Sequence, residues 1–222
     1  MAGIAIIDYG VGNLRSVEKA FVAAGAEAVV SSSDTVLRQA SALVLPGVGA
    51  FANCMTELAA RGFDELVHES VAQGKPLLGV CVGMQMMFEE SEEFGNTSGL
   101  GLLRGRVRRF AGELVVPQVG WNQVRQHGSH PLLAGVGDNA FFYFVHSYFC
   151  EVDDQALVIG ETDYGVPYAS VVAQGTICGV QFHPEKSQAA GLRLLANFSK
   201  LSADFTQRRK GAKTQRYEGS KE

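Results

Sequence analysis

Residues 76–85 read PLLGVCVGMQ, and this stretch decides the fold. An apolar segment leads directly into Cys81, which is flanked by Gly79 and Gly83. The spacing G-x-C-x-G is the thiol counterpart of the nucleophile elbow, where a sharp turn from strand to helix lifts one side chain above a sheet. The turn also places the sulfur at a helix N-terminus, where free N–H groups and the helix dipole favour a thiolate. The stretch therefore predicts a nucleophilic cysteine after a buried strand.

Most free cysteines are small buried hydrophobic residues, which is the alternative interpretation of Cys81. Its flanking glycines and its place between strand and helix argue against that alternative. Cys54, Cys150 and Cys178 have no such surroundings, so we interpret them as packing residues. Four cysteines spread this widely do not suggest a disulfide framework and are typical of a reducing cytoplasm.

Strand and helix patterns alternate in the first half of the chain. Apolar segments predict strands at residues 4–8, 28–30, 42–45 and just before Cys81. Helical periodicity follows at residues 14–24, after Asp34, and over residues 55–73. This order predicts an α/β fold of three layers around a mostly parallel, doubly wound sheet. The loops at 9–13, 46–51 and 81–85 all follow strands, so they are expected to share one edge of the sheet.

The pattern changes after Gly99. Short segments predict strands at residues 107–110, 113–116, 122–124, 141–146 and 168–172. They predict an antiparallel strand layer added to the parallel core and closed by a helix over residues 191–201. We therefore predict one domain over residues 1–201. Residues 202–222 are polar without an apolar period, which predicts a flexible C-terminal tail.

Composition excludes several classes of partner. The 222 residues are 46% hydrophobic and 19% charged, with a net charge of −4. This balance gives no electrostatic reason to expect nucleic acid or an anionic membrane surface. The longest apolar runs have the length of strands, and the start of the chain lacks the pattern of a secretory signal. We expect a cytoplasmic protein.

Five histidines compete for the role of general base. Three have polar surroundings that indicate surface positions, namely His68, His127 and His130. His146 lies in an apolar strand pattern, where a histidine with satisfied hydrogen bonds is the usual interpretation. His183 ends the apolar segment 177–182, and Glu185 lies two residues on, on the same side of an extended chain. The pair predicts a base with an orienting carboxylate, although on spacing alone a solvated loop acid at 185 stays open.

The loop at residues 46–51 is glycine-rich. It lacks the Lys-Ser/Thr of a phosphate-binding P-loop, and a simple tight turn is the alternative. An oxyanion hole explains more, because backbone N–H groups of Val82 and of Val48 or Gly49 would point at a negative oxygen beside Cys81.

Residues 79–85 and 181–187 together resemble the two catalytic signatures of the class I, triad-type glutamine amidotransferases. Residues 8–14, 120–122 and 143–148 are similar to the glutaminase subunits of imidazole glycerol phosphate synthase, and the resemblance covers about residues 3–200. It implies that Cys81 attacks glutamine while His183, oriented by Glu185, moves protons. It also implies that glutamine is held at Gly49, Gln85, Glu93, Ser147 and Tyr148.

The resemblance further implies a heterodimer with a cyclase subunit built as a (β/α)8 barrel, and neither cofactor nor metal. The candidate docking residues are Gly10, Val11, Gly12, Asn13, Trp121 and Asn122. A glutaminase subunit of another class I enzyme, such as anthranilate synthase, is the alternative within the superfamily. A stand-alone cysteine hydrolase and a non-catalytic protein that kept the fold are the alternatives outside it.

Overall fold

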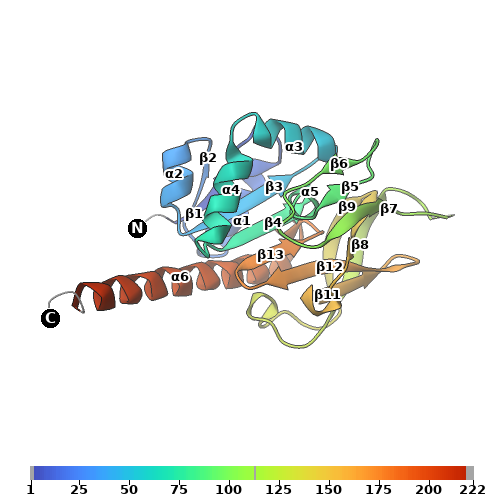
Figure 1. Cartoon of the computed structure of the whole chain (residues 1–222). Helices are drawn as coiled ribbons and strands as arrows, with labels where there is room; N and C mark the ends of the chain where they lie inside the picture. The colour runs from blue at the N-terminus through green and yellow to red at the C-terminus, as the bar shows by residue number, and fades with distance from the viewer. Residues whose placement is uncertain (1–2, 113, 219–222) are drawn as a thin grey trace.

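The computed structural model describes residues 3–112 and 114–218, and its core is a parallel sheet with the order β2-β1-β3-β4-β13 (Figure 1). The strands are β1 (Ile4–Ile7), β2 (Ala28–Ser31), β3 (Ala42–Gly47), β4 (Leu77–Cys81) and β13 (Ile177–Val180). Neighbours along this order pair in parallel. Apart from the edge strand β2, every residue of these strands is buried. Burial on both faces is why their sequences are continuously apolar.

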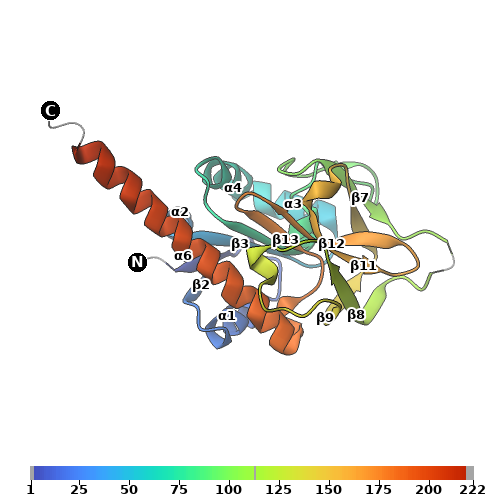
Figure 2. The same cartoon turned by 90° about the horizontal axis from the view of Figure 1, so that it is seen from below.

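Helices cover both faces of this sheet. Their bounds are α1 (Leu14–Ala23), α2 (Asp34–Gln39), α3 (Phe51–Ala59), α4 (Phe63–Ala72), α5 (Val82–Gln85) and α6 (Gln188–Glu218). The helices α1 and α6 pack together on one face, and α3 and α4 lie on the other (Figures 1 and 2). The predicted three-layer α/β fold is confirmed.

Two helices differ from the prediction. The single helix expected over residues 55–73 is divided, because Gly62 adopts a left-handed conformation with φ of 67° between α3 and α4. The closing helix α6 continues to Glu218, where a flexible tail from residue 202 is predicted. Ala, Gln, Lys and Arg are frequent in this segment and have high helix propensity, so a helix already nucleated by packing can propagate through it. The domain boundary at residue 201 and the flexibility of the residues after it stay predictions.

The remaining strands continue the parallel sheet, and all but one of their pairs are antiparallel. They are β5 (Glu90–Ser91), β6 (Thr97–Ser98), β7 (Gly105–Arg109), β8 (Gln118–Gln126), β9 (Ala140–His146), β10 (Tyr148–Val152), β11 (Val158–Asp163) and β12 (Pro167–Gln174). Short 3-10 turns lie at Pro131–Leu133, Gln155–Leu157 and Pro184–Lys186. The branch point is β12, which pairs with β13 and leads through β10 to β7, β5 and β6, and through β11 to β8 and β9.

The strand predicted at residues 113–116 is wrong for residues 114–116, which form no strand, and residue 113 lies outside the described residues.

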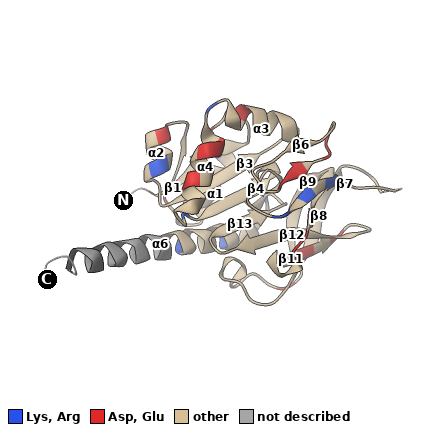
Figure 3. Ribbon diagram, viewed as in Figure 1, with Lys and Arg blue, Asp and Glu red and all other residues tan. Residues whose placement is uncertain are grey.

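Acidic and basic residues are interspersed along the described elements (Figure 3), with ion pairs such as Arg106–Glu151 across β7 and β10. Within the described residues, no helix is long and apolar enough to cross a membrane.

Candidate active site

The turn between β4 and α5 has the geometry of a nucleophile elbow. Cys81 has φ of 55° and ψ of −116°, a backbone conformation that residues other than glycine rarely adopt. A Cβ on Gly83 would lie 1.9 Å from the Leu45 carbonyl oxygen, and a Cβ on Gly79 would lie 2.7 Å from the Gly83 oxygen. Only glycine at these two positions lets the backbone pass so closely. Because α5 is only one turn long, few peptide dipoles contribute to the positive potential at the Cys81 sulfur.

His183 and Glu185 form a buried pair next to this elbow. The Nδ1 atom of His183 lies 2.9 Å from Oε1 of Glu185, and their side chains are 5% and 1% exposed. The backbone N–H of His183 donates to the Tyr143 carbonyl at 2.9 Å, which fixes the histidine against β9. Glu185 is therefore not a solvated loop acid.

The electrostatics of His183 depend on its two neighbours. Burial lowers the pKa of His183, but the nearby Cys81 sulfur and the Glu185 carboxylate outweigh this effect and raise the pKa to about 10. The site therefore favours an imidazolium between a sulfur and a carboxylate at neutral pH. Among the described residues, His183 Nε2 and Glu185 Oε2 are the buried side-chain atoms without a hydrogen-bond partner. The free Nε2 gives His183 one nitrogen with which to serve a ligand.

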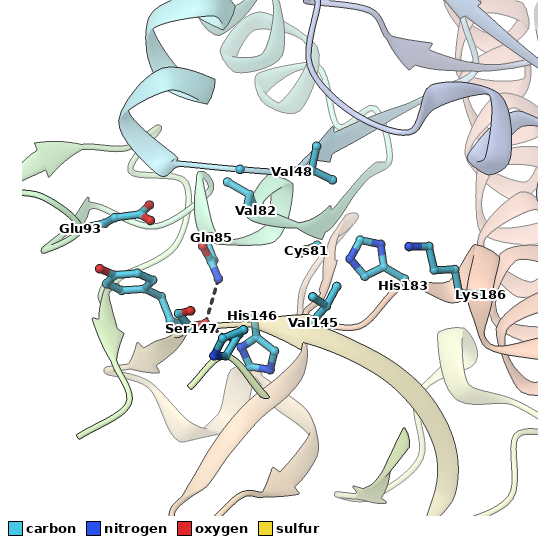
Figure 4. Close-up of a pocket in the computed structure, with 13 residues that line it drawn as sticks. Val48, Cys81, Val82, Gln85, Glu93, Val145, His146, Ser147, His183 and Lys186 are labelled. Atoms are coloured by element: carbon cyan, nitrogen blue, oxygen red, sulfur yellow. Dashed lines mark hydrogen bonds between the residues drawn. The ribbon is translucent and has the colours of Figure 1, made fainter. Parts of the chain in front are cut away.

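A cavity of 320 Å³ opens at the elbow (Figure 4). It is lined by residues from both halves of the chain: Val48, Gly49, Cys81, Val82, Gln85, Glu93, Pro117, Val145, His146, Ser147, Tyr148, His183 and Lys186. The structure thus brings together every predicted residue of the nucleophile, the oxyanion hole and the glutamine site. Glu185 does not line the cavity, because it lies on the Nδ1 side of His183.

Two glutamines connect the cavity to the sulfur. Nε2 of Gln85 donates to the Tyr148 carbonyl and to Oε1 of Gln181, both at 3.0 Å. Nε2 of Gln181 lies 3.9 Å from Sγ of Cys81. Sequence reasoning missed Gln181, although it stands in the same short segment as His183.

The glycine-rich loop is held by two side chains, those of Tyr9 and Cys54. The Tyr9 hydroxyl donates to the Pro46 carbonyl at 2.6 Å, and the Cys54 thiol donates to the Val48 carbonyl at 3.4 Å. Because a trans peptide is planar, an anchored Val48 carbonyl also fixes the direction of the next N–H group, that of Gly49. Gly49 itself has φ of 86°, which favours glycine at this position.

The predicted docking residues lie outside the cavity. A Cβ on Gly12 would lie 3.5 Å from Cβ of Pro46, so the loop at residues 10–13 borders the glycine-rich loop. Trp121 is 46% exposed on β8 and meets the Tyr143 ring edge to face at 6.1 Å. Nζ of Lys186, which lines the cavity, lies 5.5 Å from the same ring. The loop at residues 10–13 and strand β8 thus approach the elbow from different parts of the fold.

The described residues contain no cluster of three or more His, Cys, Asp or Glu side chains that would hold a metal ion. All four cysteines are free thiols. The chemistry available at the cavity is that of a thiol, a paired imidazole and backbone N–H groups.

The sequence profile described as Glutamine amidotransferase class-I matches residues 5–201, and the chain belongs to this family. An imidazole glycerol phosphate synthase subunit HisH of Symbiobacterium thermophilum is 48% identical over 205 residues, covering 92% of this chain and 97% of that protein. The HisH subunit of Aromatoleum aromaticum is 51% identical over 209 residues, covering 89% and 98%. Within its class, the chain is thus a member of the HisH family.

Solved structures agree on the fold. A crystal structure of a glutamine amidotransferase has a TM-score of 0.72 at 20% identity and covers 90% of this chain and 98% of its own. The structure of PurLQS from Thermotoga maritima has a TM-score of 0.68 at 16% identity, with coverage of 88% and 96%. At these identities the similarity concerns the fold alone.

Proposed function

We propose that this chain is the glutaminase subunit of imidazole glycerol phosphate synthase, that it hydrolyses glutamine at Cys81, and that it passes the ammonia to a cyclase subunit. One observation carries the proposal. The buried His183–Glu185 pair and the elbow cysteine converge on one cavity, in a chain about half identical to HisH subunits along most of its length.

The reaction follows from the positions of the groups. The Cys81 sulfur attacks the carboxamide carbon of glutamine, and N–H groups of Val82 and of Val48 or Gly49 stabilise the oxyanion. His183, held by Glu185, gives its proton to the departing nitrogen as the C–N bond breaks, so ammonia leaves and a thioester remains. Water then attacks the thioester carbon while His183 accepts a proton, which releases glutamate and restores the sulfur.

The amino-acid end of glutamine fits the far side of the cavity. Glu93 supplies a negative charge for the α-ammonium, and backbone groups at Ser147 and Tyr148 meet the carboxylate. Gly49 and Gln85 complete the site, with the Gln85 amide held by Tyr148 and Gln181. The cavity volume of 320 Å³ suits a ligand of this small size.

Ammonia needs a protected route because it is mostly protonated in water at neutral pH and then has no lone pair for attack. We place the partner, a (β/α)8-barrel cyclase, on the face that carries Gly10, Val11, Gly12, Asn13, Trp121 and Asn122. Support comes from exposed apolar side chains on β8 and β9, namely Val119 at 60%, Trp121 at 46% and Phe141 at 54%. Four free thiols in the chain support a reducing compartment, the cytoplasm.

The test measures glutamate release from glutamine by this chain alone and with the barrel subunit, with and without the nucleotide that the barrel binds. We expect release that depends on Cys81 and is accompanied by imidazole glycerol phosphate in the complete complex. Synthesis from ammonium salts by the same complex is the control for folding and docking. A complex that uses ammonium salts but never glutamine would overturn the proposal.

A further inference from the structure

A second histidine, which the reaction above does not use, lines the same cavity. His146 ends β9 and is 6% exposed. Its ring lies among the rings of Phe110, Phe144 and Tyr168, at centroid distances of 5.3, 5.7 and 5.3 Å. Figure 4 shows it below the cavity, next to Ser147. A buried imidazole in an aromatic cage needs partners for both ring nitrogens.

Both ring nitrogens of His146 have a hydrogen-bond partner. Nδ1 of His146 lies 2.7 Å from the Tyr148 carbonyl oxygen, and Nε2 lies 3.2 Å from the Tyr168 hydroxyl. A carbonyl oxygen only accepts, so Nδ1 carries a proton. Burial, opposed by the bond to Tyr148 and aided by the charge of His183, lowers the pKa of His146 to about 4. The ring is therefore neutral at pH 7, and Nε2 accepts its hydrogen bond.

This protonation state decides the rest of the network. If Nε2 of His146 accepts, the Tyr168 hydroxyl must donate its one proton to it. The same hydroxyl lies 3.0 Å from Oε1 of Gln118 on β8, a buried side chain whose oxygen can only accept. The Gln118 amide must then turn its NH₂ group toward Tyr168, an orientation that hydrogen-bond logic assigns.

The network holds the backbone at which the glutamine carboxylate is placed. The Tyr148 carbonyl accepts from His146 and also from Nε2 of Gln85 at 3.0 Å. The preceding carbonyl, that of Ser147, accepts from the Phe110 N–H at 3.1 Å. With the carbonyls on both sides of Tyr148 anchored, the Tyr148 N–H is fixed and points away from Phe110, because each peptide is planar and trans.

We propose that His146 and Tyr168 are positioning residues for glutamine: the Tyr168 hydroxyl holds a neutral His146 in its Nδ1–H tautomer, and His146 orients the Ser147–Tyr148 backbone that receives the carboxylate. The two histidines of the cavity thus have opposite tasks. His183 carries a proton during the reaction, whereas His146 keeps one proton on one nitrogen. This inference rests on the proposed function and names what organises one end of its substrate site.

The first experiment needs no activity. Nitrogen-15 NMR of the histidine rings, assigned with His146→Asn, reports the protonation and tautomer of His146 in the wild-type chain at pH 7. We expect a neutral ring with the proton on Nδ1. A proton on Nε2, alone or in an imidazolium, would overturn the inference while leaving the proposed glutaminase untouched.

The second experiment compares glutamine hydrolysis by Tyr168→Phe and wild type in the complex. The variant loses one oxygen and keeps the ring, so we expect the KM for glutamine to rise about 3- to 10-fold, the worth of one hydrogen bond, with kcat within about twofold. Tyr164→Phe is the matched control, because that hydroxyl donates to the Val115 carbonyl instead, and its KM should not change. A loss confined to kcat, or equal effects of the two variants, would contradict positioning.

Substitution of His146 itself separates packing from hydrogen bonding. His146→Asn keeps a donor near the Nδ1 position and should retain a KM close to that of Tyr168→Phe, whereas His146→Leu removes the donor and should raise KM further. Ammonia-dependent synthesis should be the same in both variants. If His146→Leu folds, as judged by its thermal unfolding, and binds glutamine as well as wild type, the role of His146 is excluded.

Discussion

The Glu93 carboxylate accepts a hydrogen bond of 2.6 Å from the backbone N–H of Phe51, the first residue of α3. Glu93 also lines the cavity. The residue proposed to meet the α-ammonium of glutamine therefore also holds the end of the glycine-rich loop. Substrate binding and loop position share one carboxylate.

Substitution of Glu93 should separate these two tasks. Glu93→Gln keeps an oxygen that can accept from Phe51 but loses the negative charge. We expect a higher KM for glutamine. The increase should correspond to a loss of about 1.5–3 kcal/mol of binding free energy, the contribution of a hydrogen bond to a charged group, with little change in thermal unfolding. Glu93→Ala should show the same loss together with a lower unfolding temperature. An unchanged KM in Glu93→Gln would remove Glu93 from the substrate site.

The protonation of His183 predicts how stability changes with pH. Its pKa rises from an ordinary 6.5 to about 10 in the folded chain. Since the folded state holds this proton more tightly, its contribution to stability is complete below pH 6.5 and is lost as pH rises through about 10. Chemical unfolding at several values between pH 6 and 10 should show a decline in the free energy of unfolding that is smaller in His183→Gln. Parallel curves for the two proteins would contradict the assigned pKa.

Removal of the nucleophile should abolish one reaction and spare another. By analogy with other catalytic triads, Cys81→Ala should lower glutamine-dependent turnover by about 10⁶-fold. Synthesis from ammonium salts in the complex should continue at the wild-type rate. Cys178→Ala, which removes a buried thiol from β13, is the control for the loss of a sulfur atom and should keep both activities.

The glycine after the elbow should be intolerant of even one methyl group. A Cβ on Gly83 would lie 1.9 Å from the Leu45 oxygen, so Gly83→Ala should destabilise the fold by about 1–3 kcal/mol through overpacking. Gly137→Ala is the matched control, because a Cβ there meets nothing within 4 Å and the backbone is not left-handed. Equal unfolding temperatures of the two variants would show that the elbow relaxes more easily than its geometry indicates.

The parallel core could be predicted because its strands are buried on both faces and therefore apolar without interruption. The same pattern located Cys81 at the end of β4. Strands β10 and β11 were missed for the opposite reason. Each mixes buried and exposed positions, β10 follows directly on the bend at Ser147, and β11 has register shifts around Gly160.

The candidate site likewise contains some contacts that a local sequence pattern predicts and others that it does not. His183 and Glu185 lie two residues apart, so their pairing could be predicted, although only burial in the structure excludes a solvated acid at 185. The Tyr168 hydroxyl that pairs with His146 lies 22 residues further along the chain, and its own partner Gln118 lies 50 residues before it, so no local pattern connects the three side chains. Such contacts arise from strand pairing, which a single sequence does not specify.

The most direct test of the central claim uses a glutamine analogue whose carboxamide is replaced by an electrophilic carbon. Incubated with the complete complex, it should form one covalent adduct, located on Cys81 by peptide mass spectrometry, and an excess of glutamine should prevent the labelling. His183→Ala should strongly slow the labelling of Cys81. An adduct on Cys54, Cys150 or Cys178, or none on a complex that makes product from ammonium salts, would contradict the assignment of Cys81 as the glutaminase nucleophile.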